Sequence, residues 1–258
     1  MTRADRSERN MQYYQCDKYP IEFVLSENID KHFAPHNHVR HYVLSMVMQG
    51  VVTAYLGNRE VEYHRGDVFI IPPYTVHSVH QTKDTKLLSM CIGTTFIEES
   101  NLEAAEGIVQ ELLRNAVEQG IFENEQSEKL LASLRTIYNL QDKDREEMDA
   151  GIKNLTDKIT SHPEQDLPIE ALAADIYVSK YYFIRKFKNC IGMTPHQFCI
   201  QNRIRKSQKL LDAERTVGEI SAEMGFYDQS HFDKAFRKIV GISPAEYIHS
   251  KNTMQQTT

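Results

Sequence analysis

The sequence has few cysteines, no long hydrophobic run and no apolar segment at its start. Its four cysteines, Cys16, Cys91, Cys190 and Cys199, have neither metal-site nor redox spacing, which indicates ordinary thiols in a reducing compartment. No run approaches the length of a membrane span, and the first residues are polar and charged, unlike a signal peptide. These absences argue against a membrane-spanning or secreted chain and predict a cytoplasmic one.

Acidic residues are missing from one segment. Between Ile176 and Leu211 the chain has eight Lys or Arg and no Asp or Glu. The average composition, 36 acidic residues in 258, predicts about five in such a window. The net charge of −6 hides this feature, because residues 145–251 carry 16 basic and 15 acidic side chains and the remainder carries 14 and 21. A cationic segment without acids suits the phosphate backbone of DNA.

Residues 216–248 have the pattern of two short helices joined by a turn. Thr216 and Glu219 form a capping box that begins the first helix, and Gly225 can take the left-handed conformation that ends it. Asp228 caps the second helix. Apolar residues recur on one face of each helix: Val217, Ile220 and Met224, then Phe232, Phe236 and Ile239. This arrangement predicts a helix-turn-helix.

The same pattern occurs once more upstream, at an offset of 49 residues from the second helix onward. Phe183, Phe187, Gly192, Thr194 and Pro195 correspond to Phe232, Phe236, Gly241, Ser243 and Pro244. The upstream copy is predicted as a helix over Pro168–Asp175 and a helix over Lys180–Asn189 capped by Ser179. A structural helical repeat is one interpretation, and the missing acidic charge favours a DNA-binding repeat instead.

Residues 148–250 resemble the DNA-binding domain of the AraC-type family of bacterial transcription regulators. The resemblance is carried by Leu172-Ala173, Ser179, Tyr182-Phe183, Arg185, Phe187-Lys188, Gly192, Pro195, Arg203, Leu210-Leu211, Ile220, Gly225-Phe226, Asp228, Ser230, Phe232, Phe236, Gly241, Pro244 and Tyr247. The chain departs from the family pattern at Ser221, where Ala is usual, and at Ile248, where Arg usually follows the Tyr. The second departure is expected to remove one phosphate contact.

In a helix-turn-helix the N-terminal residues of the second helix reach base edges in the major groove. The predicted DNA-binding residues are Lys180, Tyr181, Ile184, Arg185 and Lys188 in the first copy and Gln229, Ser230, Lys234 and Arg237 in the second. Arg185 suits guanine, Gln229 suits adenine, and Asp233 could accept a hydrogen bond from cytosine. The alternative for each single position is a solvated helix face.

A connecting helix is predicted from Pro195 to Leu211, which is roughly 25 Å long at 1.5 Å per residue. Such a spacer would place the two recognition helices about 34 Å apart, the repeat of one DNA turn. One chain would then read two successive major grooves. Basic residues on the spacer either contact phosphate or are solvated: Arg203, Arg205, Lys206 and Lys209.

Residues 20–97 have the pattern of short strands. Ile21, Phe23 and Leu25 alternate, residues 42–48 and 51–56 are strand-like runs, and Pro72-Pro73 ends another strand. The spacing of the turns predicts a small barrel or a double-sheet jelly roll. This segment resembles the cupin-type sensory domain often found ahead of AraC-type DNA-binding domains. The match is carried by Pro35-His36-Asn37-His38, Gly50, Gly66-Asp67-Val68-Phe69-Ile70-Ile71-Pro72-Pro73 and His77.

Three imidazoles at the mouth of a barrel would suit a metal. His36 and His38 are two residues apart and so face the same side of a strand, and His77 follows the Pro-Pro turn. However, Tyr42 stands where the cupin pattern usually has a Glu. Three interpretations remain open: a divalent transition metal on the three histidines, a metal-free pocket in which they and Tyr42 bind a small polar ligand, or histidines with a structural role.

The pattern becomes helical after the strands. Ala105, Ile108, Val109, Leu112 and Ala116 form one apolar stripe, and Leu130, Leu131, Leu134, Ile137 and Tyr138 form a second. These stripes either pack against the barrel and each other or form a dimer interface, as the family resemblance implies. The predicted organisation is a mobile arm (1–18), a ligand-sensing domain (19–98), a helical dimerisation segment (99–140), a linker (141–147) and a DNA-binding domain (148–250).

The predicted fold class is α+β, with a cupin-like β-barrel (jelly roll) followed by helices and an all-α C-terminal domain of two helix-turn-helix motifs joined by a long helix. The predicted function is ligand-responsive, sequence-specific transcription regulation without enzymatic activity. Its expected partners are double-stranded DNA, a small-molecule effector, a second copy of the chain and RNA polymerase, and no membrane. The alternative is a metal-dependent cupin enzyme or metal sensor fused to a DNA-binding module, which the missing Glu disfavours.

Overall fold

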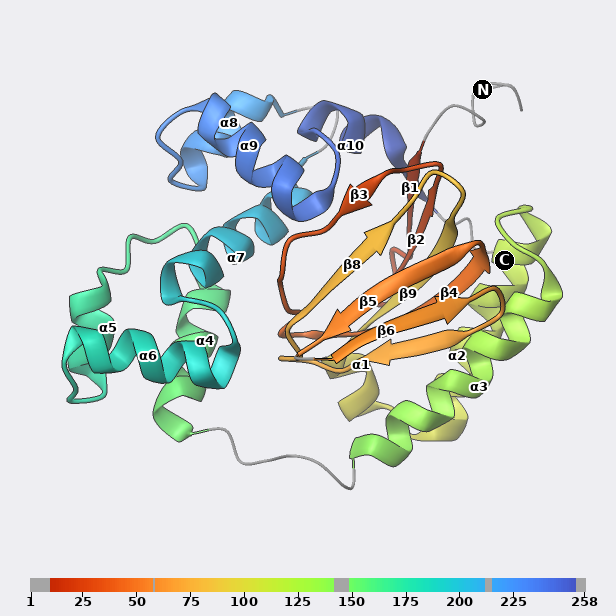
Figure 1. Ribbon diagram of the computed structural model, residues 1–258, viewed down its shortest axis with the longest axis horizontal. Helices are drawn as coiled ribbons and strands as arrows, with labels where there is room; N and C mark the ends of the chain where they lie inside the picture. The colour runs from red at the N-terminus through yellow and green to blue at the C-terminus, as the bar shows by residue number, and fades with distance from the viewer. Residues whose placement is uncertain (1–9, 58, 142–148, 212–214, 254–258) are drawn as a thin grey trace. The chain divides into compact units, whose positions relative to one another are not determined.

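The computed structural model describes residues 10–57, 59–141, 149–211 and 215–253, which divide into two compact units (Figure 1). The strands and the first three helices form the N-terminal unit, and the later helices form the C-terminal unit. The α+β class predicted from the sequence is confirmed. Within the described residues, no helix combines the length and the apolar character needed to cross a membrane.

The N-terminal unit contains two sheets. The six-stranded sheet has the order β10-β1-β2-β9-β4-β7, and the four-stranded sheet has the order β3-β8-β5-β6. The strands are β1 Met11–Gln15, β2 Ile21–Glu27, β3 Lys31–His32, β4 His41–Gln49, β5 Val51–Leu56, β6 Arg59–His64, β7 Val68–Ile71, β8 His77–Gln81, β9 Lys86–Gly93 and β10 Lys251–Thr253. Neighbouring strands are antiparallel, apart from the parallel pair β1 and β10.

The strand pattern read from the sequence matches these elements. In β2 the residues Ile21, Phe23 and Leu25 are buried and alternate with more exposed positions, as a half-buried strand requires. Gly50 joins β4 to β5 with a φ of 74°, and a Cβ there would lie 2.8 Å from the carbonyl oxygen of Asp84. Because the turn needs both a positive φ and a close backbone approach, glycine is the residue that fits.

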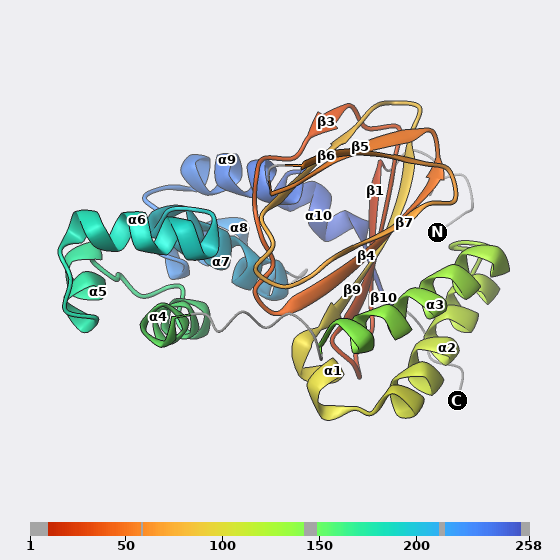
Figure 2. The same cartoon turned by 60° about the horizontal axis from the view of Figure 1, so that its bottom comes forward.

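Three helices complete the N-terminal unit: α1 Thr94–Glu99, α2 Leu102–Glu118 and α3 Asn124–Gln141. Helices α2 and α3 lie side by side along the six-stranded sheet (Figures 1 and 2). The two apolar stripes face this sheet and each other, and members such as Ala105, Val109, Leu130 and Leu134 have no exposed surface. The stripes are therefore part of the core of one chain and are not a free dimer surface.

The predicted mobile arm is wrong for part of its length. Residues 11–15 form β1, whose side chains Met11, Tyr13 and Tyr14 are only 4–7% exposed. These hydrophobic residues lie in a largely polar stretch of sequence, and they become buried when β1 pairs with β2. The predicted linker lies almost entirely outside the described residues, since 142–148 are among the gaps.

The C-terminal unit contains seven helices within the described residues: α4 Ala150–Ser161, α5 Ile169–Asp175, α6 Lys180–Ile191, α7 Pro195–Leu210, α8 Val217–Glu223, α9 Gln229–Val240 and α10 Pro244–Ser250. The predicted helix starts are confirmed by side-chain caps at Ser179, Thr216 and Asp228. Gly192 and Gly241 end α6 and α9 in the left-handed conformation. Helix α7 contacts α4, α6, α8 and α9 and is the shared element of both helix-turn-helix motifs.

A short segment from the N-terminal half also belongs to this unit. Phe33–Asn37 groups with the C-terminal helices, and Asn37 has no exposed surface. The Asn37 side chain donates to the carbonyl of Ile191 at 2.9 Å, and the Gln201 side chain donates to the carbonyl of Asn37 at 2.8 Å. These bonds satisfy polar groups that burial would otherwise leave without partners.

Candidate nucleic-acid interface and ligand pocket

The two predicted recognition helices, α6 and α9, present the predicted residues outward. Phe183, Phe187, Phe232 and Phe236 have no exposed surface and fix the inner face of each helix. Of the predicted DNA-binding residues, Ile184 is half-buried, and these are exposed: Lys180, Tyr181, Arg185, Lys188, Gln229, Ser230, Lys234 and Arg237. The structure therefore leaves these side chains able to reach a ligand, as a helix-turn-helix requires.

The basic side chains of α6 make only weak contacts within the protein. Lys180 pairs with Glu170 at 2.5 Å, and this hydrogen bond raises the pKa of Lys180. The guanidinium of Arg185 lies over the ring of Tyr182 at 5.8 Å. Because both partners of the Lys180 pair are about half exposed, the pair contributes little to folding, and Lys180 can exchange its carboxylate for a phosphate.

Asp233 differs from its neighbours on α9. It is half-buried, and burial raises the pKa of its carboxyl group, while the Arg237 charge opposes that shift. Its Oδ1 atom is buried and accepts no hydrogen bond from the residues that the structure describes. Because this oxygen is covered by the protein, a cytosine amino group cannot reach it, and the predicted hydrogen bond from cytosine would have to use the other carboxylate oxygen of Asp233.

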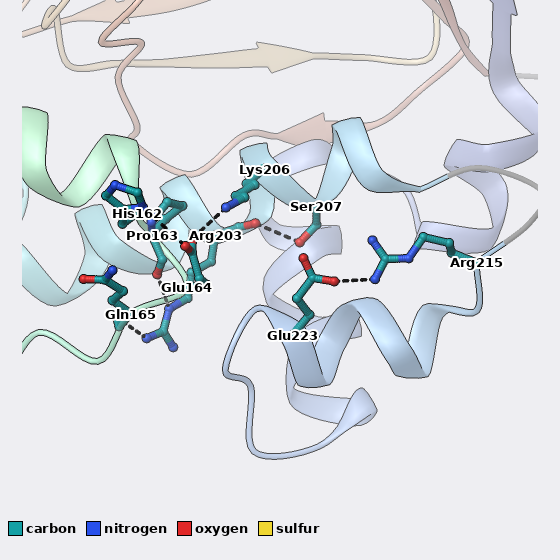
Figure 3. A network of polar contacts seen from close by, with 9 residues as sticks. All are labelled: His162, Pro163, Glu164, Gln165, Arg203, Lys206, Ser207, Arg215 and Glu223. Atoms are coloured by element: carbon teal, nitrogen blue, oxygen red, sulfur yellow. Dashed lines mark hydrogen bonds and ion pairs between the residues drawn. The ribbon is translucent and has the colours of Figure 1, made fainter.

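Helix α7 carries a contact that the sequence did not predict (Figure 3). The Arg203 guanidinium donates to the carbonyls of Pro163 at 2.8 Å, Gly225 at 2.9 Å and Gln165 at 3.2 Å. Arg203 is therefore neither the phosphate contact nor the solvated residue that we expected, because its five donors match a cluster of carbonyls at the ends of neighbouring elements. Lys206 pairs with Glu164 at 2.7 Å beside it.

The structure brings the three predicted histidines together. The rings of His38 and His77 stack with centroids 5.0 Å apart, and one ring nitrogen of each of His36, His38 and His77 lies within 4.8 Å of the others. Nδ1 of His36 lies 2.8 Å from the Ala34 carbonyl, and Nδ1 of His77 lies 2.9 Å from the Thr75 carbonyl. A carbonyl only accepts, so Nδ1 donates in both rings and the lone pair of each neutral ring is at Nε2. This donor set fits zinc, nickel or iron as well as a polar organic ligand.

Tyr42 does not join these histidines. Side chains alternate along β4, and Tyr42 packs with Leu44 and Met46 against the core that α2 and α3 cover. The three imidazoles are therefore grouped without Tyr42.

A cavity of about 290 Å³ lies elsewhere in the N-terminal unit, where α3 meets β4 and the turn before β7. Its lining residues are Met46, Val47, Met48, Arg65, Gly66, Glu125, Gln126 and Lys129. Lys129 pairs with Glu125 at 3.0 Å and donates to the carbonyl of Gly66 at 3.3 Å. The cavity joins residues as far apart in the chain as Met46 and Lys129, and no local sequence signal predicted it.

Comparison with known proteins identifies both halves. A model of the AraC-like ligand binding domain matches residues 19–154, and a model of a helix-turn-helix domain matches residues 172–250. The HTH-type transcriptional regulator MtrA of Neisseria gonorrhoeae is 31% identical over 126 residues, which are 46% of this chain and 42% of MtrA. The lactose operon transcription activator of Staphylococcus xylosus is 23% identical over 234 residues, which are 80% of this chain and 83% of that protein.

The match to MtrA spans less than half of the length of that relative, as does the match to the probable transcriptional regulator LumQ of Photobacterium leiognathi, of which 36% is covered. Among solved structures, ToxT from Vibrio cholerae O395 superposes with a TM-score of 0.60 over 93% of this chain and 98% of its own. Its sequence identity of 13% shows a shared fold alone. Because the ligand-binding model spans more than half of the chain and the helix-turn-helix model follows it, the protein belongs to the AraC-type family of transcriptional regulators.

Proposed function

We propose that the protein is a ligand-responsive, sequence-specific DNA-binding transcription regulator that reads two successive major grooves with α6 and α9. The observation that carries this proposal is the paired exposure of polar and basic side chains on two recognition helices whose inner faces are fully buried. The segment without acids between Ile176 and Leu211 supports it, since an anionic backbone approaches such a surface without repulsion.

The experiment is selection of a duplex from a random library, followed by measurement of Kd. Arg185→Ala should weaken binding to the selected duplex by about 1–3 kcal/mol and relax preference at one base pair, because its guanidinium can form two bonds to guanine. Arg59→Ala is the control, since Arg59 is also an exposed arginine but lies in the N-terminal unit, and it should leave Kd unchanged. Equal weakening on all sequences would mean that Arg185 contacts only phosphate.

The proposed effector site is the cluster of three imidazole side chains of His36, His38 and His77. Neutral imidazoles donate and accept hydrogen bonds, so together they can orient a polar or anionic metabolite. His38→Ala should abolish the response to an effector found by thermal-shift screening while DNA binding without effector persists. A variant with a full response would place the effector site elsewhere, and the cavity beside α3 is the next candidate.

A second candidate function is metal sensing by the same histidines, favoured by the 4.8 Å clustering of their nitrogens. A bound transition metal would be held by three neutral imidazole nitrogens. Metal analysis of the purified chain and of His77→Ala tests this: stoichiometric zinc, nickel or iron that the variant lacks supports the metal sensor. Curated relatives are transcriptional regulators, and we infer that this chain is likewise no enzyme.

The proposal includes a second copy of the chain and RNA polymerase as partners, and the cytoplasm as the location. The two apolar stripes are used inside one chain, so a second copy must dock on another surface. Sedimentation of the chain at tens of micromolar tests dimerisation, because interfaces of standard size associate in that range or below. A monomer at that concentration would remove the second copy from the proposal.

A further inference from the structure

The turns that lead into the two recognition helices each carry a tyrosine that is almost fully exposed. Tyr177 is 97% exposed and lies two residues before the N-cap Ser179 of α6. Tyr227 is 92% exposed and directly precedes the N-cap Asp228 of α9. Among the described residues, neither side chain forms a hydrogen bond, an ion pair or a ring contact. Each turn therefore exposes one large aromatic ring to water shortly before its recognition helix begins.

Tyr177 also has an unfavourable backbone conformation. The first helices of the two motifs are followed by equivalent caps, Ile176 and Met224, and the next residue is Tyr177 in one motif and Gly225 in the other. Both adopt positive φ angles, 56° for the tyrosine and 69° for the glycine. Glycine takes this conformation without penalty, whereas a bulky residue with a Cβ does not. Neither the strain nor the exposed ring of Tyr177 is offset by a contact within its own unit, which points to an external ligand.

We propose that Tyr177 and Tyr227 hold the DNA backbone at the entrance to each major groove, each hydroxyl donating a hydrogen bond to a phosphate oxygen while the ring covers the adjacent sugar. The inference rests on the proposed DNA-binding function and extends it beyond the helices. When the N-terminus of a recognition helix meets base edges, the residues just before its cap lie at the groove rim, where the phosphates are. Tyrosine can donate to a phosphate there without adding charge.

Charge favours DNA over a protein as the ligand of this surface. The acid-free segment begins at the turn that carries Tyr177, so the local field attracts an anion. In the second motif the carboxylate beside Tyr227 belongs to Asp228, which already accepts a hydrogen bond from the backbone of His231 at 2.7 Å. Both motifs therefore offer a phosphate a neutral tyrosine donor in the turn before the recognition helix.

The test uses the complete chain and a duplex that it selects from a random library. Tyr177→Phe and Tyr227→Phe should each raise Kd about threefold to tenfold, the factor expected for loss of one hydrogen bond. The slope of log Kd against log salt should not change, because no charge is removed. Tyr63→Phe is the matched control, since that ring stacks on Phe69 in the N-terminal unit, and it should leave Kd unchanged.

Tyr177→Gly separates a DNA contact from a folding defect. Glycine suits the positive φ, so the melting temperature should be maintained or raised while Kd rises at least as much as for Tyr177→Phe. A methylphosphonate at the contacted phosphate should weaken the unaltered chain and have little further effect on Tyr177→Phe.

Unchanged Kd for Tyr177→Phe, Tyr227→Phe and Tyr177→Gly, with a duplex still selected, would overturn this inference and leave the proposed function intact. Reduced transcription at unchanged Kd would also overturn it, and would assign the surface to a protein partner. If the unaltered chain selected no duplex, the proposed function would fail together with the inference.

Discussion

Arg203 shows how one side chain can fix the geometry of two motifs. Its guanidinium bonds to carbonyls at residues 163 and 165, before α5, and at Gly225, which ends the first helix of the second motif. The carbonyl groups at helix ends and turns have no partner within their own helix, so a cation that reaches several of them replaces water. Arg203 thereby links elements of both motifs to α7, and Figure 3 shows it beside Pro163 and Gln165.

Arg203→Lys should lower the free energy of unfolding of the C-terminal unit by about 1–3 kcal/mol, because an ammonium group cannot span three carbonyls with the geometry of a guanidinium. Urea denaturation measures this change. Arg205→Lys is the matched control, since Arg205 bonds to Gln208 on the same helix, and its effect should stay within about 0.5 kcal/mol. Equal effects of the two substitutions would show that water replaces Arg203 without cost.

Asp233 should make the stability of its unit depend on pH. Burial raises the pKa of its carboxyl group, so the protonated form is favoured in the folded state relative to the unfolded state. The stabilisation is fully present below the unfolded pKa, near the ordinary value of 3.8, and is lost as the pH rises through the folded pKa. Asp233→Asn should therefore raise the melting temperature at pH 7 and remove this part of the pH dependence.

The same substitution should change base preference. An amide presents both a donor and an acceptor, whereas the carboxylate only accepts, so Asp233→Asn should reduce the preference for cytosine at one position. Repeating the duplex selection with the variant measures this. An unaltered consensus combined with a higher melting temperature would show that the carboxylate has no role in reading bases.

At the scale of elements, the segment 33–37 connects the predicted pocket to the helices. Asn37 is buried and bonded to Ile191 and Gln201, and the next residue in the chain is His38. A ligand that moves His38 must therefore act on the backbone next to a fixed residue of the C-terminal unit. A ligand can switch DNA binding only if it binds the DNA-competent and the DNA-incompetent state with different affinities, and this link would supply such a difference.

Gln201→Leu should lower the free energy of unfolding by about 1–3 kcal/mol, because it leaves buried polar groups of Asn37 without partners. It should also reduce the effect of effector on Kd, with DNA binding in the absence of effector retained. Gln110→Ala, on the exposed face of α2, is the control and should change neither quantity. A full effector response in Gln201→Leu would mean that coupling follows another route.

At the scale of the whole molecule, the two units exchange segments of chain. The C-terminal unit includes residues 33–37, and the N-terminal unit includes the end of the chain from Ser250 onward, where β10 pairs with β1. The division expected at residues 141–147 is therefore incomplete. A fragment beginning at residue 148 lacks 33–37, and a fragment ending at residue 140 lacks β10.

Ending the chain after Ser250 should lower the free energy of unfolding of the N-terminal unit by about 1 kcal/mol, since β1 loses the hydrogen bonds of its parallel neighbour. It should also promote association, because β1 becomes an open sheet edge. Urea denaturation and light scattering measure the two effects. Ending the chain after Thr253 retains β10 and is the control. Identical behaviour of both truncated chains would show that β10 contributes nothing to the sheet.

Local features of the sequence determined the helices of both motifs and several strands of this protein. The capping boxes, the glycine stops and the period of the apolar residues predicted the helices of both motifs, because each signal acts within one or two turns of chain. The repeat predicted that the two motifs share one design, with their recognition residues turned outward. The alternation in β2 and the turn at Gly50 predicted strands for the same reason.

Only the tertiary structure decided which surfaces meet. From the sequence, the apolar stripes of α2 and α3 suit a dimer interface or a core equally well, because either arrangement buries an apolar face. In the structure they pack against the sheet and are part of the core. Tyr42 projects from the side of β4 that faces the core, and so it does not reach His77. Residues 11–15 form a strand because β2 pairs with them. The contacts of Arg203 and Asn37 join residues from about 20 to more than 160 positions apart, and no local pattern records such distances.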